Sequence, residues 1–188
     1  YFILQKNSPW NLGKMMKNKG IKFPIVTKPI NEGSSLGVNI CKNKLQFTKN
    51  YSKLINEHDR ILVEEYIPGK EIQVAVMGKK ALGAIELVPK REFYDYKAKY
   101  SSKAKTKHIM PEPISFKKNK EVLNIAKKAH SALGCRGITR SDFRFFNNQF
   151  YLLETNTQPG MTKLSLVPEI AEYCGINFED LVVQMVKD

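Results

Sequence analysis

The 188 residues are 42% hydrophobic, 10% aromatic and 26% charged, which is ordinary usage for a globular chain of one domain or two small lobes and excludes a disordered or collagen-like chain. Apolar runs such as Ile61-Leu62-Val63 are far shorter than the ~18 residues that a membrane-spanning helix needs. The net charge of +13 suits an anionic partner, but only 5 of the 31 basic residues are arginine, the residue best suited to reading bases, so sequence-specific nucleic-acid binding is disfavoured.

The first third of the chain predicts helices and short strands separated by glycine and proline signals. Gly20 is a helix stop, and Pro29 breaks the strand that precedes it. The expected elements are a helix over 8–20, a strand over 23–28, a small-residue loop over 31–37, a strand over 38–41 in a hairpin, a helix over 51–59 and a strand over 61–67.

The remainder predicts a second group of strands and helices, which begins after Pro68-Gly69. Strands over 71–77 and 80–87 form an antiparallel pair around Gly78. The apolar spacing of Val122, Ile125, Ala126, Ala129 and Leu133 predicts an amphipathic helix over 119–133, followed by strands over 138–146 and 150–155 and a helix over 178–186. The mixture is an α+β fold, with lobes over 1–67 and 68–188.

One segment between these groups is unusually basic. Residues 90–107 carry six lysines and one arginine among three tyrosines. We expect a flexible basic loop there, whose charges repel one another unless an anion such as a nucleotide is bound.

Three constellations carry chemistry. Lys28 ends a strand before the loop Asn31 to Gly37, whose backbone amides could wrap phosphate oxygens. Glu64 and Glu65 end another strand, and the following turn leads to Glu71, which is an arrangement suited to an adenine edge and ribose hydroxyls. Taken singly, each is better explained as an ordinary surface turn.

The third constellation consists of Arg140-Ser-Asp142 and Glu154-Thr-Asn156 on consecutive strands. Strand alternation sends the outer two residues of each triplet to one face, where carboxylate and amide oxygens could bind Mg²⁺. The alternative is a structural ion pair between Arg140 and Asp142. For Asp142 and Glu154 to lie directly opposite, their midpoint at residue 148 predicts a three-residue loop, Asn147 to Gln149, in place of a two-residue turn.

Together these motifs resemble the ATP-grasp fold, and specifically the central and C-terminal portions of the D-alanine-D-alanine ligase family. The resemblance extends over nearly all 188 residues and includes two segments that distinguish this family from other ATP-grasp enzymes, Phe93-Tyr-Asp-Tyr96 and Asn156-Thr-Gln-Pro-Gly-Met-Thr162. It implies two α+β lobes with a nucleotide between them, the small lobe over 1–67 and the large lobe over 68–188. The activity implied is ATP-dependent ligation of two D-alanines through a D-alanyl phosphate, for peptidoglycan and the cell wall.

The resemblance also assigns roles residue by residue. ATP would be bound by Lys28, Ser35, Glu64, Glu65, Tyr66, Ile67, Glu71, Lys99 and Leu153. The metal, Mg²⁺ or Mn²⁺, would be bound by Asp142, Glu154 and Asn156. Catalysis would involve Arg140 and the Gly160 amide at the oxyanion, with Ser34 and Tyr100 in a closing loop, and the second D-alanine would contact Ser165 and Leu166.

The same resemblance sets the remaining expectations. The family's N-terminal domain is absent from this sequence, so we expect the chain to bind Mg-ATP weakly without ligating D-alanine. Its three unclustered cysteines and the lack of a signal-peptide pattern favour the cytoplasm, and the family suggests a homodimer for the full-length parent, with no nucleic-acid or membrane partner. The alternatives are a D-alanine-D-lactate ligase or another carboxylate-amine ligase, and a non-catalytic basic binding remnant.

Overall fold

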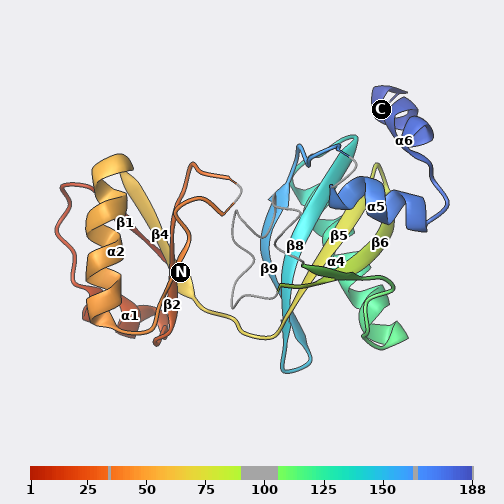
Figure 1. The fold of residues 1–188 in the computed structure, drawn as a ribbon. Helices are drawn as coiled ribbons and strands as arrows, with labels where there is room; N and C mark the ends of the chain where they lie inside the picture. Colours follow the sequence, from red (N-terminus) through yellow and green to blue (C-terminus); the bar gives the residue numbers. More distant parts are fainter. Residues whose placement is uncertain (34, 90–105, 163–164, 188) are drawn as a thin grey trace. The chain divides into compact units, whose positions relative to one another are not determined.

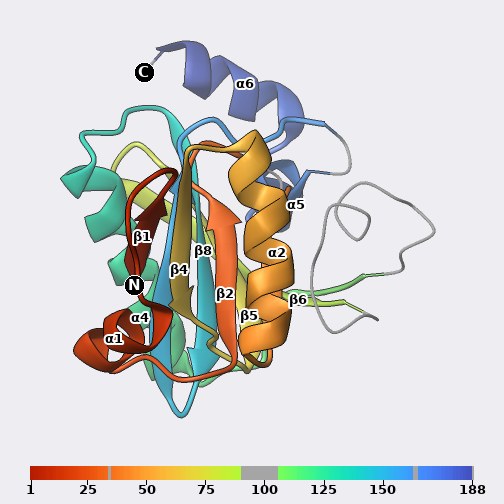
Figure 2. The ribbon, with the colours of Figure 1, turned by 90° about the vertical axis from the view of Figure 1, so that its left-hand side faces the viewer.

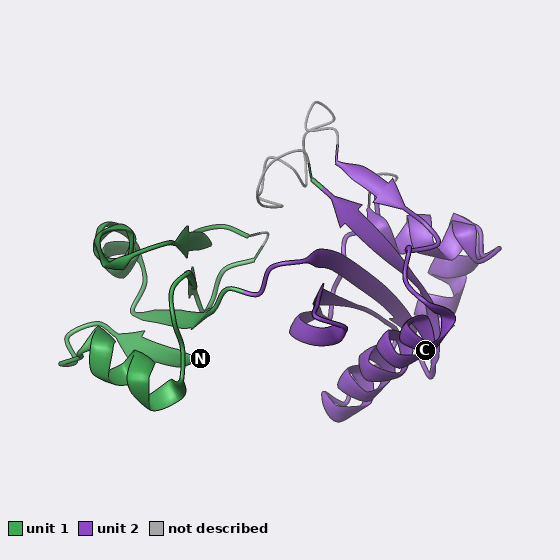
Figure 3. Cartoon of the chain, turned by 90° about the horizontal axis from the view of Figure 1, so that it is seen from below, with its two compact units in different colours: residues 1–66, 89–105 green, residues 67–88, 106–188 purple. Residues whose placement is uncertain are grey.

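The computed structural model describes residues 1–33, 35–89, 106–162 and 165–187. The chain divides into two compact units, residues 1–66 with 89–105 and residues 67–88 with 106–188 (Figure 3). Each unit has its own sheet, and both sheets are antiparallel, so the chain is α+β. The assignment of 1–67 and 68–188 as the small and large lobes of an ATP-grasp enzyme stays a prediction.

Unit 1 contains a four-stranded sheet in the order β1-β4-β2-β3. Its helices α1 and α2 cover one face (Figure 2), where Phe47 of α2 is fully buried. The strand register and the alternation of side chains place Lys28 and Glu64 on the opposite face. The elements are β1 (Phe2–Gln5), α1 (Leu12–Lys19), β2 (Ile25–Pro29), β3 (Asn39–Cys41), α2 (Lys44–Glu57) and β4 (Arg60–Glu65).

The helices of unit 1 begin where asparagine side chains cap them. Asn11 accepts a hydrogen bond from the Lys14 amide, and Asn43 accepts one from the Gln46 amide. The second cap starts α2 seven residues before the predicted position at 51, so that prediction was wrong at its N-terminal end. The predicted stop at Gly20 is confirmed, because this residue has φ of 64° and accepts the left-handed conformation without a Cβ clash.

Unit 2 is built on a five-stranded sheet in the order β7-β6-β5-β8-β9 (Figure 1). The predicted hairpins, β5 with β6 and β8 with β9, are both present, and β5 and β8 pair in the centre. The strands are β5 (Lys70–Met77), β6 (Lys80–Val88), β7 (Lys107–Ile109), β8 (Ile138–Phe146) and β9 (Gln149–Asn156).

The predicted amphipathic helix α4 (Phe116–Ala132) packs on one face of this sheet through Val122 and Ala126. The prediction that Leu133 belongs to the buried stripe was wrong, because this side chain is 60% exposed. His130 takes the last buried position instead, and its Nδ1 lies 2.9 Å from the hydroxyl oxygen of Thr139. A hydrogen-bonding partner on β8 therefore lets a polar residue replace the expected leucine.

The other face of the sheet is covered by a helix that the sequence analysis did not predict. Helix α5 (Leu166–Tyr173) lies against β5 and β6 (Figure 1). Its Ile170 side chain packs near Gly83 of β6. Pro168 obscured it in the sequence, but proline is tolerated in a first turn, where the backbone N–H has no intrahelical acceptor. The last helix, α6 (Phe178–Lys187), follows as predicted.

None of the helices in the described ranges is long and apolar enough to cross a membrane. The greater part of the basic segment, residues 90–105, lies outside the described residues.

Candidate active site

The hairpin of β8 and β9 sets the spacing of the predicted metal ligands. Its turn is Asn147-Asn148, with φ of 47° and 63°, and Phe146 pairs directly with Gln149. The predicted three-residue loop was therefore wrong. Two consecutive asparagines supply the left-handed conformations that a two-residue turn with the twist of a hairpin requires.

A β-bulge restores the pairing that the turn alone would not give. Phe143 pairs with Leu152 and Asp142 pairs with Glu154, so Leu153 is the extra residue on β9. Directly opposed residues of an antiparallel pair share a face, and the predicted common face of Asp142 and Glu154 is confirmed.

The same register brings Arg140 opposite Asn156 on that face. Ser141 and Thr155 occupy the other face, where their hydroxyl oxygens are 3.0 Å apart. Arg140 donates to both oxygens of Asp142, with N to O distances of 2.8 and 3.0 Å, and both side chains are largely buried. The ion pair offered as the alternative to a metal site is thus present.

The oxygen donors on this face are chemically suited to a hard cation. Glu154 is exposed, Asp142 is buried, and the Asn156 Oδ1 accepts the Gln158 amide at 3.0 Å. Among the described residues, no three His, Cys, Asp or Glu side chains gather as a metal-binding group, and the predicted set relies on an amide for its third oxygen. Carboxylate and amide oxygens have two lone pairs each, so bonds to protein groups do not by themselves prevent metal binding.

The neighbouring strand β5 extends this face toward Glu71. Glu71 lies opposite Arg144, and Gln73 lies opposite Asp142. Arg144 contacts the Glu71 carboxylate at 3.5 Å. The sequence analysis missed Arg144 and Gln73, although alternation from Arg140 through Asp142 places Arg144 on the same face.

The loop after β9 brings Gly160 and Ser165 together. A Cβ at Gly160 would lie 2.9 Å from the Ser165 hydroxyl oxygen, so only glycine fits without displacement. Ser165 precedes α5 but does not cap it, because its hydroxyl accepts from the Thr162 amide at 3.0 Å. Leu166 is buried in the helix, and Leu153 at the bulge is 40% exposed.

Helix α5 is also tied to β7 and β6 by polar contacts. His108 and Glu169 approach to 2.7 Å, and the Cys174 thiol donates to the Leu82 carbonyl at 3.1 Å. Burial raises the pKa of the Cys174 thiol above its ordinary value, and the positive charge of Lys80 offsets part of that rise.

In unit 1, the predicted nucleotide residues lie around the end of β4. The Lys28 ammonium and the Glu64 carboxylate form an ion pair at 2.9 Å, with about a fifth of each side chain exposed. Glu65 is exposed, Tyr66 donates its amide to the Pro24 carbonyl, and Ser35 has φ of 60° in the loop before β3. Ile67, which follows Tyr66 in the chain, belongs to unit 2 and is half-buried. Ser34, Lys99 and Tyr100 lie outside the described residues.

Comparison with known proteins decides the family. The model of the D-ala D-ala ligase C-terminus matches residues 2–187. The chain belongs to this family. A D-alanine--D-alanine ligase of Pelagibacter ubique is 56% identical over 183 residues, which are 97% of this chain and 59% of that protein. A Wolbachia pipientis wMel D-alanine--D-alanine ligase is 48% identical over 93% of this chain and 56% of its own length.

Solved structures of the D-alanine-D-alanine ligase family share the fold. A Bacillus anthracis D-alanine--D-alanine ligase matches with a TM-score of 0.86 and 30% identity over 99% of this chain and 60% of its own. The same enzyme complexed with ATP matches with a TM-score of 0.81 and 25% identity, over 99% of this chain and 58% of its own. The predicted ATP-grasp fold is confirmed, while this chain spans only somewhat over half the length of these relatives.

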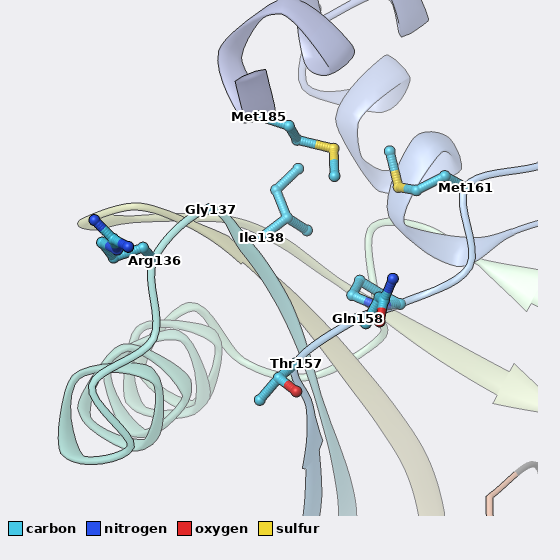
Figure 4. A pocket seen from close by; sticks show the side chains of 8 residues that line it. Arg136, Gly137, Ile138, Thr157, Gln158, Met161 and Met185 are labelled. Atoms are coloured by element: carbon cyan, nitrogen blue, oxygen red, sulfur yellow. The ribbon is translucent and has the colours of Figure 1, made fainter. Parts of the chain in front are cut away.

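This member of the D-alanine-D-alanine ligase family also has a cavity of about 580 Å³ in unit 2, beside the loop that carries Gly160. Figure 4 shows the side chains of Met161 and Met185 extending toward one another there, with Ile138 below Met185 and Arg136 farther to one side. The sequence analysis did not predict this cavity, because it joins the start of β8, the loop after β9 and α6.

Proposed function

We propose that this chain is the nucleotide-binding part of an ATP-dependent D-alanine-D-alanine ligase. The reaction phosphorylates the carboxylate of one D-alanine, and the amine of a second D-alanine then displaces phosphate to give D-alanyl-D-alanine for peptidoglycan. The observation that carries the proposal is the polar face of β8 and β9, where the bulge at Leu153 sets Asp142 opposite Glu154 and Arg140 opposite Asn156. The family match to residues 2–187 supports it.

Nucleotide binding uses side chains from both units. Glu71 accepts from ribose hydroxyls, and Leu153 packs on the base. The Lys28 ammonium and Lys99 contact phosphate oxygens. Glu64 and Glu65, with the backbone of Tyr66 and Ile67, read the adenine edge, while Ser34, Ser35 and Tyr100 belong to the loops that exclude water from the reacting phosphate.

Asp142, Glu154 and Asn156 hold Mg²⁺ or Mn²⁺. Their oxygens fit a hard cation, and such an ion would offset negative charge on the phosphate groups. The Arg140 guanidinium, already held by Asp142, keeps two donors in fixed positions. Together with the Gly160 amide it donates to the oxygen that becomes negative in the tetrahedral intermediate, where preorganised donors stabilise charge. Ser165 and Leu166 contact the second D-alanine.

Calorimetric titration with ATP tests the nucleotide part of this proposal. We expect saturable, weak binding that requires Mg²⁺ and weakens at least about tenfold in Asp142→Asn, because a metal ligand loses its charge. Glu121→Gln is the matched control, since Glu121 is an acid of the same unit that pairs with Lys118 on α4 and has no part in the proposed site. Absence of binding, or equal binding with and without Mg²⁺, would contradict the proposal.

Ligation is measured separately, as D-alanine-dependent phosphate release with the dipeptide detected by mass spectrometry. D-lactate is offered as a competing acceptor. Formation of D-alanyl-D-alanine supports the assignment, whereas formation of only the D-lactate ester would reassign the chain to the alternative ligase. Retention on nucleic acid without any ATP binding would favour the basic binding remnant.

A further inference from the structure

The Glu71 carboxylate is contacted on each of its oxygens by a different side chain. Oε2 accepts from Arg144 Nη1 and Oε1 accepts from Gln73 Nε2, both at 3.5 Å. Glu71 and Gln73 lie two residues apart on β5, and Arg144 lies opposite Glu71 on β8, so all three share one face of the sheet. The exposed fractions are 12% for the Glu71 side chain and 11% for that of Arg144.

Arg144 also holds the backbone that leads into β5. Its Nε donates to the Ile67 carbonyl at 3.1 Å, and its Nη1 reaches the Gly69 carbonyl at 3.4 Å. A guanidinium is planar and presents its N–H groups in a fixed fork, so one side chain sets the carboxylate and the approaching backbone together. Lysine has a single nitrogen on a flexible stem and cannot reproduce this geometry.

Gln73 is fully buried, and its Oε1 has no hydrogen-bond partner in the described part of the chain. A buried acceptor without a partner lowers stability, which an apolar side chain of similar volume would avoid. The reverse orientation of the amide would place Oε1 against the Glu71 carboxylate, where two acceptors repel. Stability alone therefore does not account for a glutamine here, whereas holding Glu71 does.

The close packing around Gly69 fixes the same segment from a second direction. Gly69 has φ of 95°, and a Cβ there would overlap the Phe145 carbonyl oxygen. The backbone before Glu71 thus passes against β8 at a distance that only glycine permits. The backbone that leads to Glu71 is therefore fixed, and its side chain is restrained as well.

We propose that Arg144 and Gln73 are positioning residues that fix the Glu71 carboxylate for the vicinal hydroxyls of the nucleotide ribose, and so set the preference for a ribonucleotide over a deoxyribonucleotide. This inference rests on the proposed function. A glutamate side chain has three rotatable bonds, and a carboxylate that is already oriented binds hydroxyls without losing that freedom on binding. The gain applies only to ligands that carry both hydroxyls.

The test compares the Kd of Mg-ATP with that of Mg-2′-deoxy-ATP, measured by calorimetry on the chain and its variants. We expect the wild type to prefer ATP by about tenfold, the value of one hydrogen bond to a charged group. Arg144→Lys and Gln73→Leu should each weaken ATP binding several-fold and bring the ratio of the two Kd values toward one, with little change for 2′-deoxy-ATP. Arg60→Lys, at an exposed strand arginine of unit 1, should leave the ratio unchanged.

Two variants keep the test decisive if one of them folds poorly, and thermal unfolding of each variant is followed in parallel. A merely structural role would weaken both nucleotides by the same factor, and that result, or an unchanged ratio in both variants, overturns the inference while the proposed function stands. Failure of the wild type to bind either nucleotide overturns the proposed function and this inference with it.

Discussion

Two ion pairs, one in each unit, are built differently. Lys28 and Glu64 meet through one contact of 2.9 Å, and about a fifth of each side chain is exposed. Arg140 and Asp142 meet through two contacts, and their side chains are 14% and 8% exposed. A single contact near solvent contributes little to stability and is easily replaced by a contact with a ligand. A buried bidentate pair has a well-defined geometry, and removing one partner lowers stability strongly. A ligand can therefore replace one partner of the Lys28–Glu64 pair at little cost, whereas the Arg140–Asp142 pair holds both side chains in fixed positions.

The largest expected effect comes from breaking the buried pair. Arg140→Met leaves the Asp142 carboxylate buried without its partner, and we expect unit 2 to lose about 3 kcal/mol of stability. Hydrogen exchange of the β8 amides measures this loss, since the single tryptophan, Trp10, reports on unit 1. A loss below about 1 kcal/mol would show that the two pairs do not differ in kind.

A double substitution that removes the charges of both Arg140 and Asp142 tests whether the effect of the first substitution comes from an unpaired buried charge. Arg140→Met with Asp142→Asn should recover about 1–2 kcal/mol relative to Arg140→Met alone, because the uncompensated charge is gone. The measurement is again amide exchange in β8. Strict additivity of the two substitutions would mean that the side chains are not energetically coupled.

The exposed pair of unit 1 should respond much less. Lys28→Met should change stability by less than about 1 kcal/mol, and the change should shrink at about 1 M salt, where charges are screened within ~3 Å. Denaturation in urea followed by Trp10 fluorescence reports it, since Trp10 packs on Phe47 and Tyr51 in this unit. A larger, salt-independent loss would place this pair with the buried one.

The smallest expected effect concerns an exposed charge in unit 2. It tests whether a charge interaction is weak because it is exposed or because of the unit in which it lies. Partial burial of the thiol raises the pKa of Cys174 and the charge of Lys80 lowers it, although Cys174 as a whole residue is exposed in unit 2. Lys80→Gln should raise that pKa further, so alkylation of Cys174 at neutral pH should slow by about twofold or less, as expected for a screened surface charge. The alkylation rate should rise with pH in both proteins, because the thiolate is the reactive form. Peptide mass spectrometry separates Cys174 from Cys41 and Cys135.

Much of the fold could be predicted from the sequence because helix stops, tight turns and apolar periodicity depend on residues close together in the chain. The Gly20 stop, the β5 and β6 pair around Gly78 and the amphipathic α4 were all predicted from short windows, and the structure confirms them. The predictions that were wrong depended on contacts from elsewhere in the chain. Leu133 follows the last residue of α4 and is exposed, while His130 is buried against Thr139 of β8. Helix α5 was missed because proline breaks a helix at positions after the first turn, and Pro168 was not recognised as a first-turn residue.

The candidate site divides in the same way. Alternation along each strand predicted that Asp142 and Glu154 share a face, but the loop inferred from their midpoint was wrong, because it assumed an unbroken ladder. Arg144 was missed because its contact with Glu71 depends on the pairing of β5 with β8, about 70 residues apart in the chain. Gln73 lies two residues from Glu71 on β5, and alternation alone could have placed it on the same face. The roles assigned to individual site residues stay predictions.

The bulge at Leu153 has a consequence for how this hairpin tolerates changes in length. Eleven residues separate Asp142 from Glu154, an odd number, so one of them must lie outside the ladder, and here it is Leu153 and not a residue of the turn. The conformation of the Asn147-Asn148 turn and the pairing of Asp142 with Glu154 consequently depend on different parts of the hairpin. Deleting Leu153 would place Glu154 directly after Leu152, which pairs with Phe143, so Asp142 would still lie opposite Glu154 in an unbroken ladder. The pairing of the two acidic residues therefore withstands the loss of the bulge residue, whereas the local bend and extra twist that a bulge gives to β9 would be lost.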